Sequence, residues 1–312
     1  MGKVLITGAN GFVGHHLCRY LKTLKISYKA GVRKALNSEE FSYGDLTLIK
    51  NWSPLLQDCD SVVHLAARVH VMQEDQENPL ASYRKVNTDS TMALAEAAKE
   101  NGIKKFIYLS SIKVHGKNTE ENTPFKLDDR VHPLDPYSIS KFETENKLFK
   151  LHEPGVFEVI VIRPPLVYGP EVKGNLKNLM QVVRWPVPLP FASVNNQRSL
   201  VSVYNLCDLI ATCLKVPQAS GKVFLVSDDR DLSLKELVQK FALVQKRRSF
   251  LFPFPVSLLF LIARVLNRYD YAQRLLGNLQ VDISQTKKIL NWKPPFSFEE
   301  TYSDKHSNFV QK

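Results

Sequence analysis

Short apolar runs alternate with longer amphipathic segments through the first half of the chain. Five runs are predicted to be buried strands, at residues 3–7, 27–33, 61–66, 105–109 and 156–162. Helices are predicted between them, including residues 11–24 and 137–152. Strands that are apolar throughout, rather than at alternate positions, are typical of a parallel sheet covered by helices on both faces. The pattern therefore predicts an α/β fold with a doubly wound parallel sheet.

The pattern changes after Arg163, where prolines become dense and the predicted elements short. We expect residues 1–165 to form the domain of the main sheet. Residues 166–312 are expected to form mainly a smaller, interleaved C-terminal region that binds substrate. An apolar run at 222–226 is predicted to be another core strand, so segment 199–227 is expected to return to the main sheet.

One apolar segment, at about 256–267, resembles neither a strand nor a membrane span. Prolines and a charge interrupt the apolar stretch around it, and it falls short of the roughly 20 residues that a spanning helix needs. We expect an amphipathic helix packed on the protein's own core. Peripheral contact with a membrane is the alternative, because Arg264 and Arg268 flank its apolar face.

The composition limits the classes of molecule that the protein is expected to bind. The 312 residues include 42 Lys and Arg against 31 Asp and Glu, a net charge of +11. The basic residues are dispersed, with the densest run at 245–248, and no nucleic-acid-binding motif is visible; the charge fits a phosphorylated small substrate better. The four cysteines form no CxxC pair, which predicts a reduced, cytoplasmic protein. His15, His16, His64 and His70 lack partners at metal-ligand spacing, so no metal site is predicted.

A glycine-rich turn follows the first predicted strand directly. Its sequence is TGANGFVG, with glycines at positions 8, 11 and 14, and it leads into the first predicted helix. Glycines at such a turn let the backbone approach a pyrophosphate, which the N–H groups of the following helix then bind. The turn predicts a Rossmann-like dinucleotide site whose cofactor contacts are Gly8, Asn10, Gly11, Phe12, Val13 and Gly14.

The end of the second predicted strand indicates which dinucleotide binds. An acidic residue there favours NAD, whereas a basic one can hold the 2′-phosphate of NADP. Here Arg33 and Lys34 follow the strand and no acid precedes Glu39. We therefore expect NADP(H) to be preferred over NAD(H). Asp45, followed by Leu46, is expected near the adenine.

A second group of residues indicates proton transfer. Tyr137 and Lys141 are four apart and lie on one face of a predicted helix. An ammonium close to a phenol favours the phenolate, so Tyr137 could exchange a proton near neutral pH, as hydride transfer at an alcohol requires. Ser110 and Ser111 end an earlier strand and could orient the reacting oxygen.

Together these motifs resemble the extended short-chain dehydrogenase/reductases of the NAD-dependent epimerase/dehydratase family. The resemblance covers essentially the whole chain and is specific at superfamily level. It rests on the glycine turn, on residues 64–67, 110–116, 136–141 and 163–170, and on later matches at 282–284 and 290–294.

The resemblance implies roles for individual residues. Tyr137 would be the acid/base, Lys141 would bind the nicotinamide ribose and lower the pKa of Tyr137, and Ser111 would bind the sugar hydroxyl. Further cofactor contacts would be Leu65, Ala66, Ala67, Asn87 and Pro164. Substrate contacts would be Ser111, Lys113, Asn175, Asn178, Arg198 and Arg274, the two arginines pairing with a diphosphate. A homodimer through residues 85–100 and 137–150 is also implied.

Departures from the family pattern narrow the reaction. Ile112 and Lys113 occupy the positions of the Asp-Glu pair of 4,6-dehydratases, so dehydration is not expected. Leu166 stands where several 4-epimerases have an Asn, a contact that Asn175 or Asn178 could replace. His115 takes the place of the family's usual Tyr, a change that the sequence does not explain.

These observations predict oxidoreduction at C4 of a UDP-hexose. The first interpretation is an NADPH-dependent reductase of a UDP-4-keto-6-deoxy-N-acetylhexosamine for surface polysaccharide. It follows from Arg33 and Lys34, and from the likeness of residues 64–72 and 163–170 to reductases of the UDP-N-acetylquinovosamine type. The first alternative is a UDP-hexose 4-epimerase, and the second is a non-catalytic dinucleotide-sensing scaffold.

Overall fold

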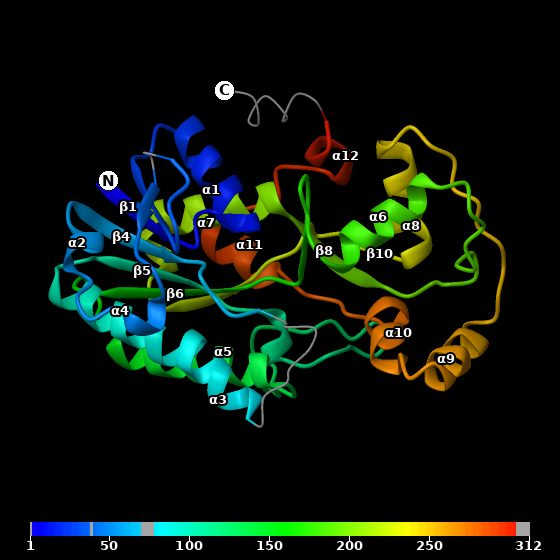
Figure 1. Cartoon of the computed structure of the whole chain (residues 1–312), viewed down its shortest axis with the longest axis horizontal. Coiled ribbons are helices and arrows are strands. Elements are labelled where there is room, and N and C mark those ends of the chain that lie inside the picture. The colour runs from blue at the N-terminus through cyan, green and yellow to red at the C-terminus, as the bar shows by residue number, and fades with distance from the viewer. Residues whose placement is uncertain (1, 38–39, 70–77, 304–312) are drawn as a thin grey trace.

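The computed structural model describes residues 2–37, 40–69 and 78–303, and its centre is a seven-stranded parallel sheet (Figure 1). In spatial order the strands are β3 (Glu40–Ser42), β2 (Tyr28–Val32), β1 (Lys3–Thr7), β4 (Cys59–His64), β5 (Lys105–Leu109), β6 (Glu158–Arg163) and β9 (Lys222–Leu225). All neighbouring strands run parallel. Because strand order reverses between β1 and β4, a crevice forms at their carboxyl ends. The predicted doubly wound sheet is confirmed.

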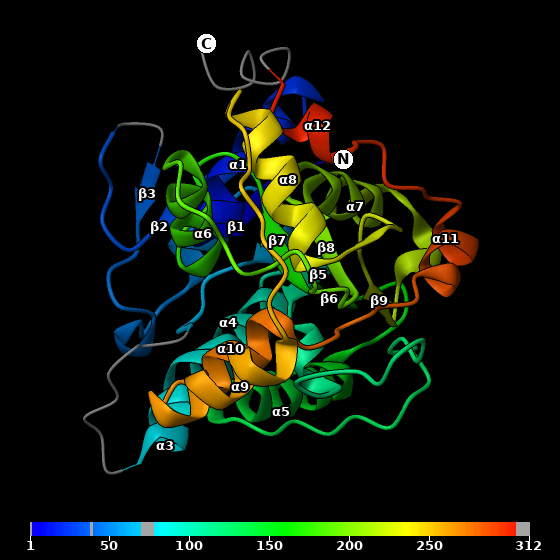
Figure 2. The same ribbon diagram turned by 90° about the vertical axis from the view of Figure 1, so that its right-hand side faces the viewer.

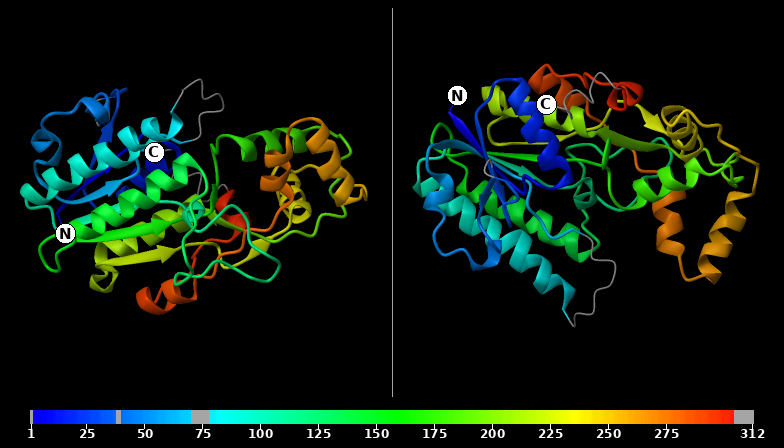
Figure 3. Two further views of the ribbon diagram at one scale, coloured as in Figure 1. Left: turned by 90° about the horizontal axis from the view of Figure 1, so that it is seen from below. Right: turned by 45° about the horizontal axis from the view of Figure 1, so that its top comes forward.

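Helices cover both faces of this sheet, as its apolar strands require (Figures 1 and 3). One face carries α1 (Phe12–Thr23), α7 (Val203–Lys215) and α11 (Ser284–Leu290). The other carries α2 (Ser53–Leu56), α3 (Pro79–Tyr83), α4 (Ser90–Glu100) and α5 (Pro136–Leu151), with a π-helical turn (Arg84–Asp89) joining α3 to α4. Alternate side chains of β1 enter opposite cores: Val4 and Ile6 pack with α1 and α7, and Leu5 packs with α4.

A smaller region lies beyond one end of the sheet (Figures 1 and 2). Its three-stranded sheet contains β7 (Leu166–Tyr168), β8 (Arg198–Ser202) and β10 (Asp231–Leu232). Its helices are α6 (Asn175–Arg184), α8 (Leu234–Val244), α9 (Val256–Val265), α10 (Tyr269–Leu276) and α12 (Phe298–Thr301). Within segment 199–227, β8 belongs to this small sheet, whereas β9 pairs with β6 in the main sheet. The chain therefore passes between the two regions more than once.

Helix α9 differs from the expected helix packed on its own core. None of its residues is buried. One side contacts the core of the small region through residues such as Leu259 and Phe260, while Leu261 and Val265 on the other side are 56% and 78% exposed. The cause is its position, since α9 and α10 project together as a hairpin that protein contacts on one side (Figure 3). Within the described ranges, no helix is long and apolar enough to cross a membrane.

Candidate active site

The glycine turn has the shape that a dinucleotide requires. Gly8 has a φ of +71°, and a Cβ added there would lie 2.9 Å from the amide nitrogen of Ala66. A Cβ on Gly14 would lie 2.2 Å from the carbonyl oxygen of Gly8, so only glycine fits at either position. Gly11 precedes α1 and no side chain caps the helix there. The first N–H groups of α1 are therefore left for an anion, which fits a pyrophosphate.

The other predicted residues of this turn differ in their exposure. Asn10 is exposed at its tip, whereas Phe12 and Val13 are partly buried against the main core. The phenol oxygen of Tyr43, a residue that the sequence analysis missed, accepts a hydrogen bond from the Gly8 N–H at 3.3 Å. Tyr43 follows β3, and no motif marks it. Its ring closes one side of the turn.

The residues expected near the adenosine lie at the carboxyl ends of β2 and β3. Arg33 and Lys34 are exposed directly after β2. The Asp45 carboxylate accepts hydrogen bonds from the N–H and hydroxyl of Thr47 at 2.9 and 3.0 Å, which lowers its pKa. It thereby begins the 3-10 turn Leu46–Leu48. Arg33 also lowers the pKa of Asp45, so these two residues lie near each other at this edge of the sheet.

The segment after β4 lies against the glycine turn. The Leu65 N–H donates to the carbonyl oxygen of Thr7 at 3.2 Å, and Ala66 and Ala67 continue it along the crevice. The predicted strand at 61–66 ends earlier, at His64, because these residues turn away from β5. Positions 70–72 of the reductase-like run, including His70, lie outside the described residues.

Asn87 and Pro164 hold neighbouring backbone in place. Asn87 is 1% exposed, and its amide bonds the backbone N–H and carbonyl of Arg68 at 2.8 and 3.1 Å and the hydroxyl of Ser140 at 3.1 Å. It thus ties the segment after β4 to α5. Pro164 accepts a hydrogen bond from the Ile112 N–H at 2.9 Å. Both residues are buried and hold the backbone around the site in place.

Three predicted catalytic residues converge beyond β5. Ser111 follows the strand and begins the 3-10 turn Ile112–Val114, while Tyr137 and Lys141 lie in the first two turns of α5. Asp135 caps that helix through a capping box with Ser138, which fixes the start of α5 and hence the position of Tyr137. A hydrogen bond joins the Tyr137 and Ser111 side chains.

The pKa values of Tyr137 and Lys141 differ from what the sequence predicts. Burial and the charge of Asp135 raise the pKa of Tyr137 well above its usual value, and Ser111 opposes this. Burial lowers the pKa of Lys141 to about 7. The Lys141 Nζ donates to the carbonyl oxygen of Leu109 at 2.8 Å and lies 5.9 Å from the centre of the Tyr137 ring. At that separation the lysine does not lower the pKa of the tyrosine in this structure.

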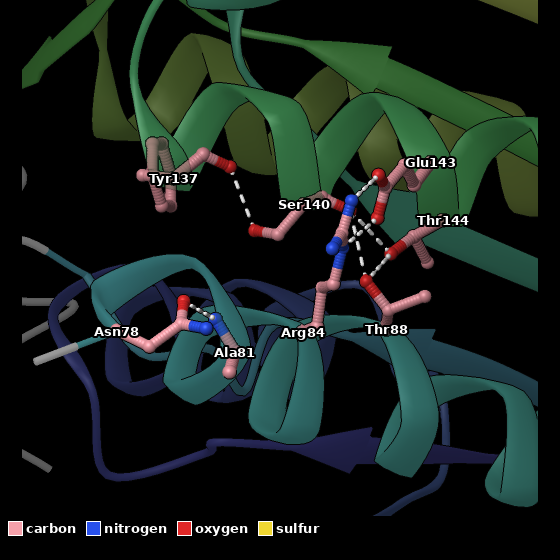
Figure 4. Close-up of polar contacts among 8 residues, drawn as sticks. All are labelled: Asn78, Ala81, Arg84, Thr88, Tyr137, Ser140, Glu143 and Thr144. Carbon is pink, nitrogen blue, oxygen red and sulfur yellow. Dashed lines mark hydrogen bonds and ion pairs between the residues drawn. The ribbon is translucent and has the colours of Figure 1, made fainter.

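Figure 4 shows how α5 is held against the preceding helices. Arg84 and Glu143 form two hydrogen bonds, Nε to Oε2 at 2.8 Å and Nη2 to Oε1 at 2.5 Å. At the next residue of α5, the Thr144 hydroxyl donates to the hydroxyl of Thr88 at 3.1 Å. These contacts lie along the same helix as Tyr137 and fix its direction.

A pocket of about 310 Å³ opens between the two regions. Five of the six predicted substrate residues line it together with Tyr137, namely Ser111, Lys113, Asn175, Arg198 and Arg274. Asn178, the sixth, is exposed on α6 and does not line the pocket. Burial lowers the pKa of Arg198 to about 10, so it stays charged at neutral pH. With Lys117, four cations line this pocket, which suits a diphosphate.

Sequence analysis missed several polar residues of this pocket. They are Lys117, Asn118, Asp135, Asp270 and Gln273. Asp135 had a visible signal, because it stands at the N-cap position before a proline. Its carboxylate lies 3.2 Å from the Nζ of Lys113, which itself lies 5.6 Å from the centre of the Tyr137 ring. Lys113, one of the two residues at the positions that the resemblance gives to the dehydratase carboxylates, thus forms an ion pair in this structure.

The structure also explains His115. Its Nε2 lies 2.8 Å from Nη1 of Arg163, so it accepts that hydrogen bond and is neutral. Arg163 also forms a buried ion pair with Glu145 of α5 at 2.5 Å. Burial and Arg163 lower the pKa of His115 to about 4. The histidine thus joins a buried network that connects the end of β6 to α5.

Fold and pocket define the class of protein, a dinucleotide-dependent oxidoreductase with its substrate pocket at the carboxyl edge of the sheet. The chain belongs to the NAD dependent epimerase/dehydratase family, whose model matches residues 4–227. Its family members are nucleotide-sugar epimerases, dehydratases and reductases, and the chain is an enzyme of this kind.

Individual relatives are informative. A UDP-glucose 4-epimerase of Vibrio cholerae is 43% identical over 99% of this chain and 95% of its own length. An N-acetyl-alpha-D-glucosaminyl-diphospho-ditrans,octacis-undecaprenol 4-epimerase of Escherichia coli O157:H7 is 29% identical over 82% of this chain and 77% of its own length. The solved UDP-N-acetylglucosamine 4-epimerase of Bacillus cereus has a similar fold, with a TM-score of 0.78, 18% identity and 99% of each chain covered.

Proposed function

We propose that this protein is a UDP-hexose 4-epimerase. The observation that carries the proposal is that Ser111, Tyr137 and four cations line one pocket at the carboxyl edge of the sheet. The choice of epimerase over the reductase first favoured by the sequence rests on the relative from Vibrio cholerae, which is 43% identical over nearly the whole chain.

The residues support the following chemistry. Ser111 and Tyr137 bind the sugar's 4-hydroxyl, and Tyr137 takes its proton as the hydrogen at C4 leaves as hydride, producing a 4-keto sugar. When bound, the nicotinamide supplies the hydride acceptor and then the donor. The proton held by Tyr137 returns to the same oxygen after the ketone has turned its other face. Arg198, Arg274 and Asn175 hold the diphosphate during that rotation.

The raised pKa of Tyr137 means that the phenol is neutral before substrate and dinucleotide bind. A phenol that is neutral at rest must lose its proton before it can act as a base. In this structure the Lys141 Nζ lies 5.9 Å from the centre of the Tyr137 ring, so we propose that the ammonium moves toward the phenol when the dinucleotide binds and then favours the phenolate. We propose that the Lys113–Asp135 pair binds a sugar hydroxyl rather than removing a proton.

The reductase remains the second candidate because Arg33 and Lys34 follow β2. An epimerase regenerates its cofactor, so these residues would decide which dinucleotide is retained, not which reaction occurs. We propose NADP(H) as the preferred form on that basis.

We also propose a homodimer through α4 and α5, which lie side by side on one face (Figure 3). A monomeric mass by sedimentation velocity would contradict the dimer.

The test is a reaction without added reductant. The purified protein is incubated with UDP-glucose or UDP-N-acetylglucosamine, and the C4 epimer is followed by NMR. Interconversion without net NADPH consumption, and without deuterium at C4 in D₂O, supports the epimerase. No interconversion, combined with stoichiometric NADPH oxidation by a UDP-4-keto sugar, would establish the reductase instead. The Tyr137→Phe variant controls for a contaminating activity.

A further inference from the structure

Basic residues are spread along the whole chain, but the excess of positive over negative charge lies mostly in two segments. Residues 172–198 and 237–281 contain eleven Lys or Arg and a single acid, Asp270. Nearly all of the overall charge of +11 therefore lies in these two segments. Both belong to the small region, and the remainder of the chain is almost neutral. An excess of one sign on one part of a protein indicates a partner of opposite sign.

Exposed apolar side chains are concentrated in the same part of the chain. Among the residues that the structure describes, 21 large apolar side chains are exposed, and thirteen of them lie between residues 182 and 271. Trp185 is 70% exposed, and on α9 Leu261, Val265 and Leu266 are 56%, 78% and 64% exposed. Apolar exposure at this density marks an interaction site rather than scattered surface residues.

The segments that carry these side chains are adjacent in space. Backbone hydrogen bonds join Leu189 to Phe250 and Phe252 at 2.8 and 3.0 Å, which places the loop after α6 beside segment 246–255. Segment 246–255 then runs down the outer end of the molecule from α8 to α9 (Figure 2). We call this end, residues 182–189, 246–255 and 258–268, the apolar–basic surface.

The apolar–basic surface also contains a shallow hollow. It is lined by Arg184, Trp185, Arg247, Arg248 and Phe250, among others. Three guanidinium groups around exposed aromatic rings suit a phosphate at the boundary between water and hydrocarbon, because Arg binds phosphate bidentately and Trp favours that boundary. On α9 and just beyond it, Arg264 and Arg268 are likewise exposed beside apolar side chains.

We propose that the apolar–basic surface docks the protein on an anionic lipid bilayer. Bilayer docking requires apolar side chains that enter the acyl boundary and cations that meet anionic headgroups, and this surface carries both. Binding would be peripheral, since the described chain has no helix able to span a membrane. Nucleic acid fits less well, because its phosphate backbone offers nothing to the aliphatic side chains of α9.

Docking would orient the pocket. Helix α10 contributes Asp270, Tyr271, Gln273 and Arg274 to the pocket lining and packs directly on α9. A bilayer bound at α9 would therefore lie beside the pocket rather than at the far side of the main sheet. The proposal stands independently of the reaction assigned above, because it concerns a surface that contains none of the proposed catalytic residues.

Vesicle co-sedimentation tests the proposal on the full chain. Vesicles of phosphatidylcholine with 30% phosphatidylglycerol are compared with phosphatidylcholine alone, at 0.1 M and 0.5 M NaCl. We expect binding to the anionic vesicles that weakens at high salt. Leu261→Asp and Val265→Asp should each weaken it about tenfold, because each removes one buried apolar side chain. Arg264→Glu with Arg268→Glu should weaken it at least tenfold.

Matched variants elsewhere serve as controls. Val156→Asp changes an apolar side chain that is 52% exposed in the large region, and Lys104→Glu reverses an exposed charge there. Both should bind vesicles as the unaltered protein does. Circular dichroism and turnover of a soluble UDP-sugar should be unchanged in every variant, which separates lost docking from lost folding.

Two outcomes would overturn the proposal. The first is equal, negligible sedimentation with both vesicle types. The second is a self-association, measured by sedimentation velocity, that Leu261→Asp and Val265→Asp abolish while vesicle binding is absent or unaffected. That result would assign the surface to a second copy of the chain instead of a bilayer.

Discussion

The two regions of this protein use polar groups in opposite ways. In the large region, polar groups that leave water have partners: Arg163 forms an ion pair with Glu145, and the neutral His64 ring forms hydrogen bonds with Thr7 and Thr91 at 2.7 and 2.9 Å. In the small region, cations line a pocket and crowd an outer surface with few acids beside them. The large region is thus built to hold reacting groups rigidly, and the small one to receive negatively charged partners.

The largest effect is expected when the phenol oxygen of Tyr137, in the large region, is removed. Tyr137→Phe should lower kcat about 10⁴-fold, because general acid–base catalysis at C4 is lost. Dinucleotide binding should persist, since the glycine turn is untouched. Steady-state turnover and fluorescence titration with the dinucleotide measure the two effects. Tyr269→Phe, an exposed tyrosine outside the pocket lining, is the matched control; full activity of Tyr137→Phe would remove the acid/base role.

The buried ion pair gives the next largest effect. Glu145→Ala leaves the guanidinium of Arg163 buried without its carboxylate, which should cost about 3 to 5 kcal/mol of unfolding free energy. Urea denaturation measures it. Arg84→Ala breaks the exposed pair with Glu143 and should cost far less, because ion pairs in contact with water contribute little to stability. Equal losses in the two variants would contradict the contrast between buried and exposed pairs.

Acid should destabilise the large region through its neutral histidines. The folded pKa of His115 is about 4 and that of His64 about 3, below the unfolded value of about 6.5. Unfolding therefore takes up protons below pH 6.5, so this stability is complete above that pH and is lost as the pH falls toward 4. For His115 alone the loss is on the order of 3 kcal/mol. His115→Gln should flatten the pH dependence of the melting temperature.

The matched control for acid stability is His132→Gln. His132 is exposed, so its removal should leave the slope of melting temperature against pH unchanged. If the slope for His115→Gln equalled that of the unaltered protein, protonation of His115 would not account for the loss of stability in acid.

In the small region we expect effects on binding rather than on chemistry. Arg198→Ala should raise KM for the UDP-sugar about 30-fold with a smaller change in kcat, because a charge-assisted contact to the diphosphate is made in both ground and transition states. Asn178→Ala changes a neighbouring residue that does not line the pocket and should leave KM unchanged. A fall in kcat alone for Arg198→Ala would contradict a role in ground-state binding.

Sequence could predict most of the large region because its signals are local. Apolar strands, the glycines at 8 and 14, and the spacing of Tyr137 and Lys141 each report on a few consecutive residues. The small region was less predictable, since its pocket joins residues distant in sequence, such as Lys113, Arg198 and Asp270. The sequence also did not predict the pKa shifts of Tyr137 and Lys141. The separation of Lys141 from Tyr137 on α5 depends on the Leu109 carbonyl, which lies at the end of strand β5.

Helix α9 shows the same limit. Its apolar pattern correctly indicates a helix, but a periodic pattern does not say whether an apolar face meets protein or solvent. Only the position of the α9–α10 hairpin at the outer end of the molecule (Figure 2) shows that protein contacts one side alone.

The smallest expected effect concerns the choice between NADPH and NADH. Here the large region resembles the small one, because Arg33 and Lys34 are exposed cations. Arg33→Ala should weaken NADPH binding about tenfold and leave NADH binding nearly unchanged, because only NADPH carries a 2′-phosphate for the guanidinium to meet. Fluorescence titrations with both dinucleotides measure the ratio, with Lys29→Ala on the same strand as control. If Arg33→Ala weakened both equally, the arginine would shape the loop after β2, and the dinucleotide would have to be selected at Asp45 or Tyr43.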